Sequence, residues 1–338
     1  MIENSQFQPN ELQALVTNAP EAKVYPLATA FPVEQTMEID NAYDVVQSQI
    51  NEAASVTGFN AGAPLRSKGE GKKVLARLTK IQHQRRLDEV DLMRFDAPRN
   101  DAEKQQIIDK NLLSVVELSQ GVDDAIEYIR AKMVYDGEFH FVDAINKSEI
   151  RFDLERPAEN KINVEKKWDA ADSTPVSDLT LAVEQFKKTN GRKKPEVIVM
   201  NSTTYAAFKR SDEIKANIYG NATDARIVTD ANVDALLNSV GLPSIVIDDS
   251  ETGVRTVEGE LEAVQHLKDG VVVLRSAVLG STMVGPSKTS QGWVMGRWVD
   301  TYSEVNPPVE GIIAGEVALP VLKNLNGVVT LKVFTETP

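Results

Sequence analysis

A chain of 338 residues, 42% hydrophobic and 26% charged, has the length and composition of a folded protein with one or two compact domains. It contains no cysteine, which excludes disulfide frameworks, thiol catalysis and cysteine-bound zinc. The net charge of -13 argues against a protein that wraps free nucleic acid, because that affinity depends on cations. An acidic wall can still enclose nucleic acid without gripping it. No secretory signal and no apolar run of membrane-spanning length is visible, so we expect a soluble, cytosolic product.

The first 44 residues are strongly acidic, with seven acidic side chains and one lysine, Lys23. Prolines scattered over residues 1–40 predict an extended arm with a short helix near 10–17. An arm with few apolar side chains is expected to contact other subunits, and the alternative is a hydrated, frayed terminus. The candidate contact residues of this arm are Glu21, Glu34, Glu38 and Asp40.

A basic segment follows at about residues 61–86, where eight lysines and arginines face a single acid, Glu70. Apolar and charged residues alternate over 74–81, which predicts the returning strand of a long hairpin that begins near 42–54. An isolated hairpin is marginal in water, so this one is expected to lie on another subunit. The alternative is a solvated loop. The candidate contact residues are Arg66, Lys68, Lys72, Lys73, Arg77 and Lys80.

Residues 101–135 predict one long helix, because apolar side chains recur at intervals of three, four or seven. Asn100 or Asp101 can cap its start, and Gly121 can bend it. A helix of this length spans roughly 50 Å, more than a small domain requires, and we interpret it as a spine. A hairpin over 139–144 and 150–154 is expected to pack on it.

From residue 176 the pattern alternates between short helices and strands, which predicts an α+β domain over about 176–310. Ser173 or Thr174 can cap its first helix. The last strands, near 316–319 and 328–334, are expected to rejoin the sheet of the first domain. The expected helices are 176–188, 203–209 and 233–240, and the expected strands are 197–200, 244–247, 271–274 and 293–305.

Catalytic and metal-binding patterns are weak. The three histidines lie in unrelated segments, and no serine nucleophile elbow or clustered metal ligands occur. The segment 69–73 lacks the first glycine and the Ser or Thr of a phosphate loop. Asp248 and Asp249 have the chemistry of a turn, and Asp123 and Asp124 that of a solvated helix face. We therefore expect no catalytic site, metal or cofactor, and a function carried by shape and contacts.

The order of these parts resembles the major capsid protein of tailed double-stranded DNA phages, which has the Hong Kong 97 fold, and especially the phage lambda major head protein family. The local sequence is similar at 162–168 with Pro175, at the strand 197–200 leading into 205–208, and at Pro307–Pro308 ahead of 318–320. The resemblance covers nearly the whole chain.

The resemblance implies an N-arm at 1–40, an E-loop region at 41–86, a P-domain at 87–175 and 311–338, and an A-domain at 176–310. It implies a structural head protein that self-assembles, through pentamers and hexamers, into an icosahedral shell around phage DNA. Assembly would occur in the host cytoplasm, with a separate scaffolding protein, a portal and a decoration protein as further partners. Shell maturation in the family involves swinging of the spine helix and E-loop. The corresponding flexing points here would be Gly58, Gly62 and Gly121.

Two alternatives stay open at this point. One is an encapsulin-like nanocompartment shell of the same fold, which would enclose a cargo enzyme. The other is a carboxylate-dependent hydrolase that uses Asp248, Asp249 or Glu251. Replacement of these acids by their amides would abolish the activity of a hydrolase and barely affect a shell protein.

Overall fold

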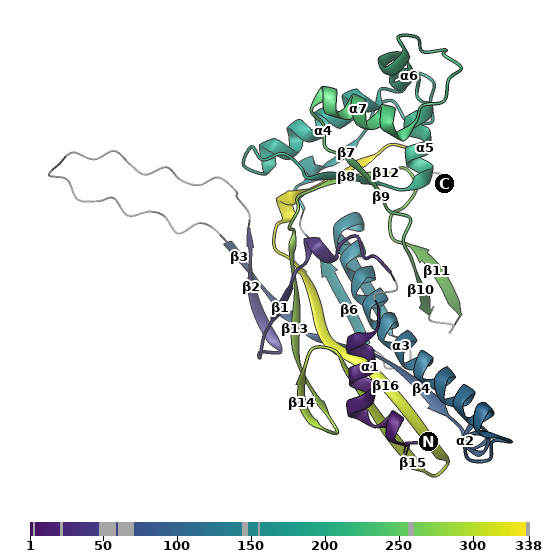
Figure 1. Cartoon of the computed structure of the whole chain (residues 1–338). Helices are drawn as coiled ribbons and strands as arrows, with labels where there is room; N and C mark the ends of the chain where they lie inside the picture. Colours follow the sequence, from purple (N-terminus) through teal and green to yellow (C-terminus); the bar gives the residue numbers. More distant parts are fainter. Residues whose placement is uncertain are drawn as a thin grey trace. The chain divides into compact units, whose positions relative to one another are not determined.

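The computed structural model describes residues 1–2, 4–20, 23–46, 59, 71–143, 148–154, 156–255 and 260–335 (Figure 1). The chain forms two compact units, each assembled from segments far apart in the sequence. The first unit comprises Met1–Ala42, Leu75–Arg130 and Ser281–Val321, and the second comprises Tyr43–Val74, Ala131–Gly280 and Leu322–Pro338. None of the described helices is both long and apolar enough to cross a membrane.

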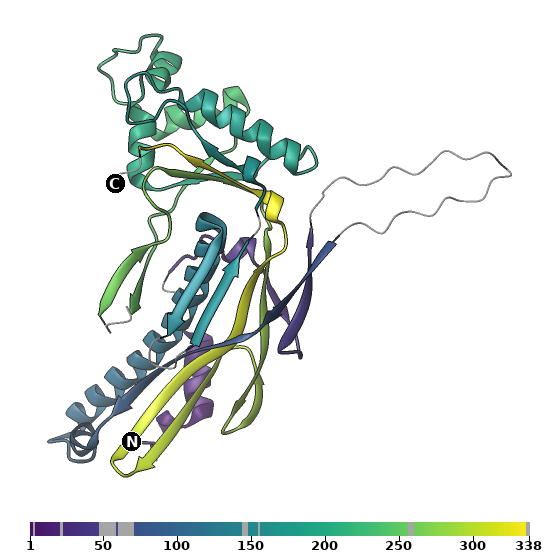
Figure 2. The same ribbon diagram turned by 180° about the vertical axis from the view of Figure 1, so that it is seen from behind.

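The first unit is built on a six-stranded sheet in which β16 (Pro308–Leu322) is the central strand. β16 pairs antiparallel with β15 (Trp298–Val305) on one side and with β4 (Thr79–Leu87) along the other. Figure 2 shows these three strands side by side. The remaining strands are β13 (Gly280–Thr289), β14 (Gly292–Met295), which pairs with β13, and β1 (Val33–Gln35), which joins β13 in parallel.

The predicted spine helix is confirmed as α3 (Asp101–Ala131), which continues into a π-helical turn, Lys132–Asp136. Asn100 caps it, since its Oδ1 accepts a hydrogen bond from Glu103 N at 2.8 Å. Gly137 ends the turn in the left-handed conformation, where glycine has no steric penalty. A short helix, α2 (Glu89–Asp96), precedes α3 and was not predicted.

Helix α3 lies along the sheet of the first unit (Figures 1 and 2). Its apolar stripe makes the contact. Val115 and Ile108 join the core residues Val299 and Ile312 from β15 and β16. About two turns further along, Val122 and Ile126 pack with Val284 and Ala318. The period of three and four residues therefore marks the side of the helix that the sheet covers.

The short helix predicted near residues 10–17 is confirmed, but the N-terminal segment packs within the first unit, which differs from the extended arm that we predicted. Helix α1 (Pro9–Asn18) contacts β15, and short 3-10 turns at Ser5–Phe7 and Ala28–Ala30 flank it. The segment buries Phe7, Leu12, Leu27 and Phe31 almost completely. Each such side chain contributes about 1.5–3 kcal/mol to folding when it is removed from water. The prediction of an extended arm rested on the acidic residues and prolines of the segment and did not take these few apolar side chains into account.

The second unit contains a five-stranded sheet covered by helices, as the alternating pattern indicated. Its strand order is β7 (Lys161–Asn163), β17 (Val328–Lys332), β12 (Val271–Arg275), β8 (Val197–Met200) and β9 (Ile245–Ile247). Its helices are α4 (Pro175–Thr189), α5 (Ser202–Arg210), α6 (Asp212–Tyr219) and α7 (Asp230–Val240). Two hairpins complete it: β5 (Glu138–Asp143) with β6 (Ser148–Asp153), and β10 (Glu251–Arg255) with β11 (Leu261–Gln265).

Several local predictions were wrong. The last strand does not rejoin the first sheet, because β17 pairs with β12 and β7. The expected strand 293–305 is divided into β14 and β15, with Gly296 between them at a φ of 83°. Neither Ser173 nor Thr174 caps α4 through its side chain; instead Glu213 Oε2 accepts a hydrogen bond from Val176 N at 2.7 Å.

The predicted hairpin of residues 42–81 is described only in part. β2 (Asp40–Val46) pairs with β3 (Gly71–Arg77) in a two-stranded ribbon. The chain then passes Leu78 and enters β4, which belongs to the six-stranded sheet. The returning strand is therefore two strands in two different sheets.

Candidate functional site

The basic side chains predicted for assembly are placed as follows. Arg66 and Lys68 lie outside the described residues, and Lys72 and Lys73 lie on β3. Arg77 and Lys80 are exposed, and Lys80 Nζ lies 4.7 Å from the centroid of the Trp298 ring. An exposed cation on an aromatic face contributes about 0.5–1 kcal/mol, so Lys80 is partly engaged within its own chain.

Of the acidic residues predicted for the N-arm, Glu34 lies on β1 at the edge of the six-stranded sheet and Asp40 begins β2. Glu21 is outside the described residues, whereas Glu34, Glu38 and Asp40 are exposed. Glu34 accepts a hydrogen bond from Ser281 Oγ at 2.7 Å. Asp40 Oδ1 lies 3.7 Å from Arg77 Nε, with both side chains at least three-quarters exposed. This pair joins one residue from each of the two predicted sets, and an ion pair so exposed is worth at most about 1 kcal/mol.

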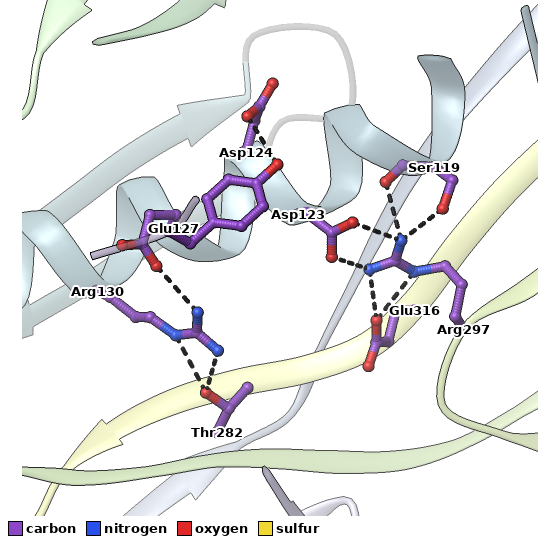
Figure 3. Close-up of polar contacts among 9 residues, drawn as sticks. Ser119, Asp123, Asp124, Glu127, Arg130, Thr282, Arg297 and Glu316 are labelled. Atoms are coloured by element: carbon purple, nitrogen blue, oxygen red, sulfur yellow. Dashed lines mark hydrogen bonds and ion pairs between the residues drawn. The ribbon is translucent and has the colours of Figure 1, made fainter. Parts of the chain in front are cut away.

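A buried ion pair on α3 holds the N-terminal segment to the spine (Figure 3). Arg130 Nη1 donates to Glu127 Oε2 at 2.9 Å, and the two side chains are only 9% and 2% exposed. Glu127 Oε1 also accepts a hydrogen bond from the backbone N–H of Leu27 at 2.7 Å. Arg130 Nη2 donates to Thr282 Oγ1 at 2.8 Å, and that hydroxyl donates to Phe31 O at 3.1 Å. The pair thus connects the helix, the N-terminal segment and strand β13.

A second cluster on α3 surrounds Arg297, which lies between β14 and β15 (Figure 3). Its guanidinium donates to Asp123 Oδ1 at 2.5 Å, to Glu316 Oε2 at 3.0 Å and to Ser119 O at 2.9 Å. Burial lowers the pKa of Arg297, but Asp123 and Glu316 outweigh this effect and raise the pKa above its usual value. Arginine suits this position because its planar fork can serve three acceptors at once.

Asp124 is also paired, which corrects our interpretation of Asp123 and Asp124 as a merely solvated face. Lys23 Nζ lies 2.9 Å from Asp124 Oδ1, and Tyr25 Oη donates to the same oxygen at 3.1 Å. Burial and the neighbouring Asp124 carboxylate raise the pKa of the Tyr25 hydroxyl. Both carboxylates therefore attach other segments to the spine helix.

Gly121 has a packing role that the sequence did not reveal. It lies within the uninterrupted helix α3, and a Cβ atom built there would lie 2.6 Å from His83 Nδ1 on β4. The absence of a side chain therefore lets strand β4 approach the helix closely. Its role as a flexing point stays a prediction, and Gly58 and Gly62 lie outside the described residues.

Two of the three carboxylates of the hydrolase alternative, Asp248 and Asp249, are used by the fold, and the third, Glu251, is exposed at the start of β10. Asp248 is buried, and it accepts hydrogen bonds from Tyr135 Oη at 2.5 Å and from Ser250 N at 3.0 Å. The second contact confirms the predicted turn. Asp249 Oδ1 accepts from Ser202 N, at the start of α5, at 2.8 Å. Within the described part of the chain, no three His, Asp or Glu side chains are grouped as metal ligands would be.

The family of the chain is decided by its match to a family model. The model for phage major capsid protein E matches residues 8–333. This chain belongs to that family. It is a structural major capsid protein of the Hong Kong 97 type, a class whose members self-associate into the shell of the virion.

Solved structures support the fold of this capsid protein. A prophage protein of E. coli CFT073, described as a capsid protein, superimposes with a TM-score of 0.61 at 12% identity, over 96% of this chain and 98% of that one. A phage-related protein of Bordetella bronchiseptica RB50 gives 0.53 at 13% identity, over 95% of each chain. The mature capsid of bacteriophage PhiM1 gives 0.50 at 11% identity, over 95% of this chain and 90% of that one. No curated protein sequence matches this chain.

Sequence reasoning missed the polar residues that hold this capsid protein together. A local signal existed for Glu127 and Arg130, whose separation of three residues puts them on one helix face. No local signal existed for Arg297, because Asp123 is 174 residues away in the sequence. Long-range pairs of this kind are visible only once the fold is known.

Proposed function

We propose that this capsid protein forms pentamers and hexamers, which close into an icosahedral shell that encloses double-stranded phage DNA. The family match over residues 8–333 carries the proposal. The net charge of -13 agrees with it, because an acidic wall encloses DNA without sequence-specific binding. Assembly in the host cytoplasm, a separate scaffolding protein, a portal and a decoration protein belong to the same proposal.

We propose that opposite charges set the register of the contacts between subunits. Apolar contacts would supply most of the binding free energy. The basic set (Arg66, Lys68, Lys72, Lys73, Arg77, Lys80) would face the acidic set (Glu21, Glu34, Glu38, Asp40) of a neighbour. Opposite charges of this kind mainly set orientation and encounter rate. Support comes from the Asp40–Arg77 pair, whose high exposure makes it weak enough to exchange for a partner from another subunit.

Maturation is proposed to move the E-loop region and the spine helix about glycines, namely Gly58, Gly62 and Gly121. Glycine tolerates the widest range of backbone conformations, which makes these positions suitable for a change of shape.

Charge reversal within the basic set tests the contact proposal. Replacement of Arg66, Lys68, Lys72 and Lys73 by glutamate should leave a folded subunit that no longer sediments as particles. A matched control replaces four other cations by glutamate and should still form particles. These cations lie in the second unit outside the basic set, at Lys166, Lys188, Arg210 and Lys215. Particle formation equal in both variants would show that the basic set does not direct assembly. Particles that contain an enzyme cargo in place of DNA would favour the encapsulin-like alternative.

A further inference from the structure

A second basic segment, separate from the one predicted for assembly, lies in the second unit at the end of helix α4 (Figure 1). Five cations occur there within eight residues: Lys187, Lys188, Arg192, Lys193 and Lys194. With the two flanking acids, Glu184 and Glu196, the stretch 184–196 has a net charge of +3, whereas the whole chain has -13. A local excess of positive charge in an acidic chain is the electrostatic signature of a site that binds a polyanion.

The helix explains only part of this charge. The carbonyl end of a helix is electronegative, and Lys187 and Lys188 complement it because they lie in the last turn of α4. The other three cations, at 192–194, follow the helix and are exposed. The effect of the helix dipole falls off within the last turn, so these three charges need a different explanation.

One exposed carboxylate is shared among several of the cations. Lys187 Nζ donates to Glu184 Oε1 at 2.5 Å, and this hydrogen bond and the lysine charge lower the pKa of that carboxyl group. The charges of Arg192 and Lys188 lower it further. Within the described chain, no hydrogen bond or ion pair is made by the side chains of Lys188, Arg192 and Lys194. The positive charge is therefore mostly uncompensated by the protein itself.

The backbone holds these cations on a fixed turn. Gly191 and Arg192 both have a positive φ, of 60° and 65°. Arg192 N donates to Lys187 O at 2.8 Å, and Lys193 N donates to Asn190 O at 3.2 Å. A left-handed conformation favours glycine or asparagine and is strained for arginine. Strain of this kind is found mainly where a side chain serves a function, and the guanidinium charge is what arginine adds here.

We infer that the segment 187–194 contacts the phosphate backbone of double-stranded DNA, an inference that rests on the proposed function. Its remaining residues, Thr189, Asn190 and Gly191, are neither aromatic nor large and apolar. Stacking on single-stranded bases needs aromatic side chains, and protein interfaces are centred on aromatic or large apolar anchors. A DNA duplex presents one phosphate charge for about every 1.7 Å of its axis, so neighbouring cations can each reach a phosphate. The contact reads no base sequence, and each copy of the subunit in a shell repeats it.

The test measures binding of a labelled duplex of about 20 base pairs to the full-length, unassembled chain by fluorescence anisotropy at several salt concentrations. At about 50 mM salt we expect a Kd of about 10⁻⁴ M or tighter, the same for two duplexes of unrelated sequence. The variant Lys188→Gln/Arg192→Gln/Lys194→Gln should bind at least about tenfold more weakly. The slope of log K against log salt should become shallower by about 2–3, because three phosphate contacts are lost.

The matched control, Lys161→Gln/Lys166→Gln/Arg210→Gln, removes the same charge from exposed positions of the same unit outside the segment. It should bind the duplex like the unmodified chain and with the same slope. Equal weakening in both variants would reveal a general charge effect and overturn the inference, as would no binding at about 0.1 mM chain. Displacement of the duplex by an oligoglutamate peptide as effectively as by unlabelled duplex of equal charge would indicate an acidic protein partner and would also overturn it. Failure of the DNA contact leaves the shell proposal standing, because particle formation is measured separately by electron microscopy.

Discussion

The buried pair of Glu127 and Arg130 should contribute more to stability than any exposed ion pair on the spine helix. Replacement of Glu127 by alanine removes the acceptor of two hydrogen bonds, from Arg130 and from Leu27 N. It leaves a buried guanidinium without its counter-charge, which costs about 3–5 kcal/mol. The unsatisfied N–H of Leu27 is part of the same loss.

A double-mutant cycle tests whether Glu127 and Arg130 stabilise the subunit as a pair or independently of each other. Arg130→Met alone leaves Glu127 charged and buried, so it should also cost about 3–5 kcal/mol. In Glu127→Ala/Arg130→Met no buried charge remains. The loss in the double variant should therefore be smaller than the sum of the single losses by about 1–3 kcal/mol.

Denaturant unfolding of the unassembled subunit measures these free energies, and hydrogen exchange at the Leu27 amide reports the local contact. The control is Asp124→Asn, three residues earlier on α3, whose partner Lys23 is 53% exposed. It should cost no more than about 1 kcal/mol. Strictly additive single losses, or a loss at Asp124 equal to that at Glu127, would refute the reasoning.

Three further expectations concern single positions. In a His83→Ala background, Gly121→Ala should stabilise the subunit by about 1 kcal/mol, because alanine has the higher helix propensity. When His83 is present the gain should be smaller, because the new Cβ displaces the His83 ring. Equal effects in both backgrounds would contradict this expectation. Arg297→Lys should lower the unfolding free energy by about 1–3 kcal/mol, because an ammonium cannot serve Asp123, Glu316 and Ser119 in fork geometry; a lysine variant as stable as the parent in thermal denaturation would count against it. Burial raises the pKa of Asp178, so folding favours its protonated form, and its ionisation at pH 7 destabilises the chain. Asp178→Asn should therefore be more stable than the parent at pH 7, and this advantage should shrink as the pH falls through the raised pKa toward the ordinary pKa of an aspartate. An advantage that grows on acidification would refute the reasoning.

Periodic patterns predicted the elements that bury a continuous face. The spine helix was found from its apolar stripe, and Asn100, which caps it, was one of the two candidates, with Asp101, that the residue types offered. The helices α4, α5 and α7 and the central strands of the second unit were found in the same way, whereas the short helix α6 was not predicted. In each case neighbouring residues carry the signal, so local reasoning is sufficient.

Predictions failed where distant segments decide the outcome. The N-terminal segment has the composition of an arm, but Phe7 and Leu12 find a partner surface on β15 and α3. The start of α4 is satisfied by Glu213, which is 37 residues from Val176. The strand pairing of β17 and the cluster around Arg297 depend on the same long-range geometry. The charge sets proposed for assembly could be read from the sequence, whereas their contacts with other subunits stay a prediction.

Electron microscopy of the purified full-length chain tests the central claim most directly, with and without co-expression of a scaffolding protein from the same phage. The account predicts closed particles tens of nanometres across, or pentamers and hexamers in their absence. A monodisperse monomer or dimer under every condition would contradict it.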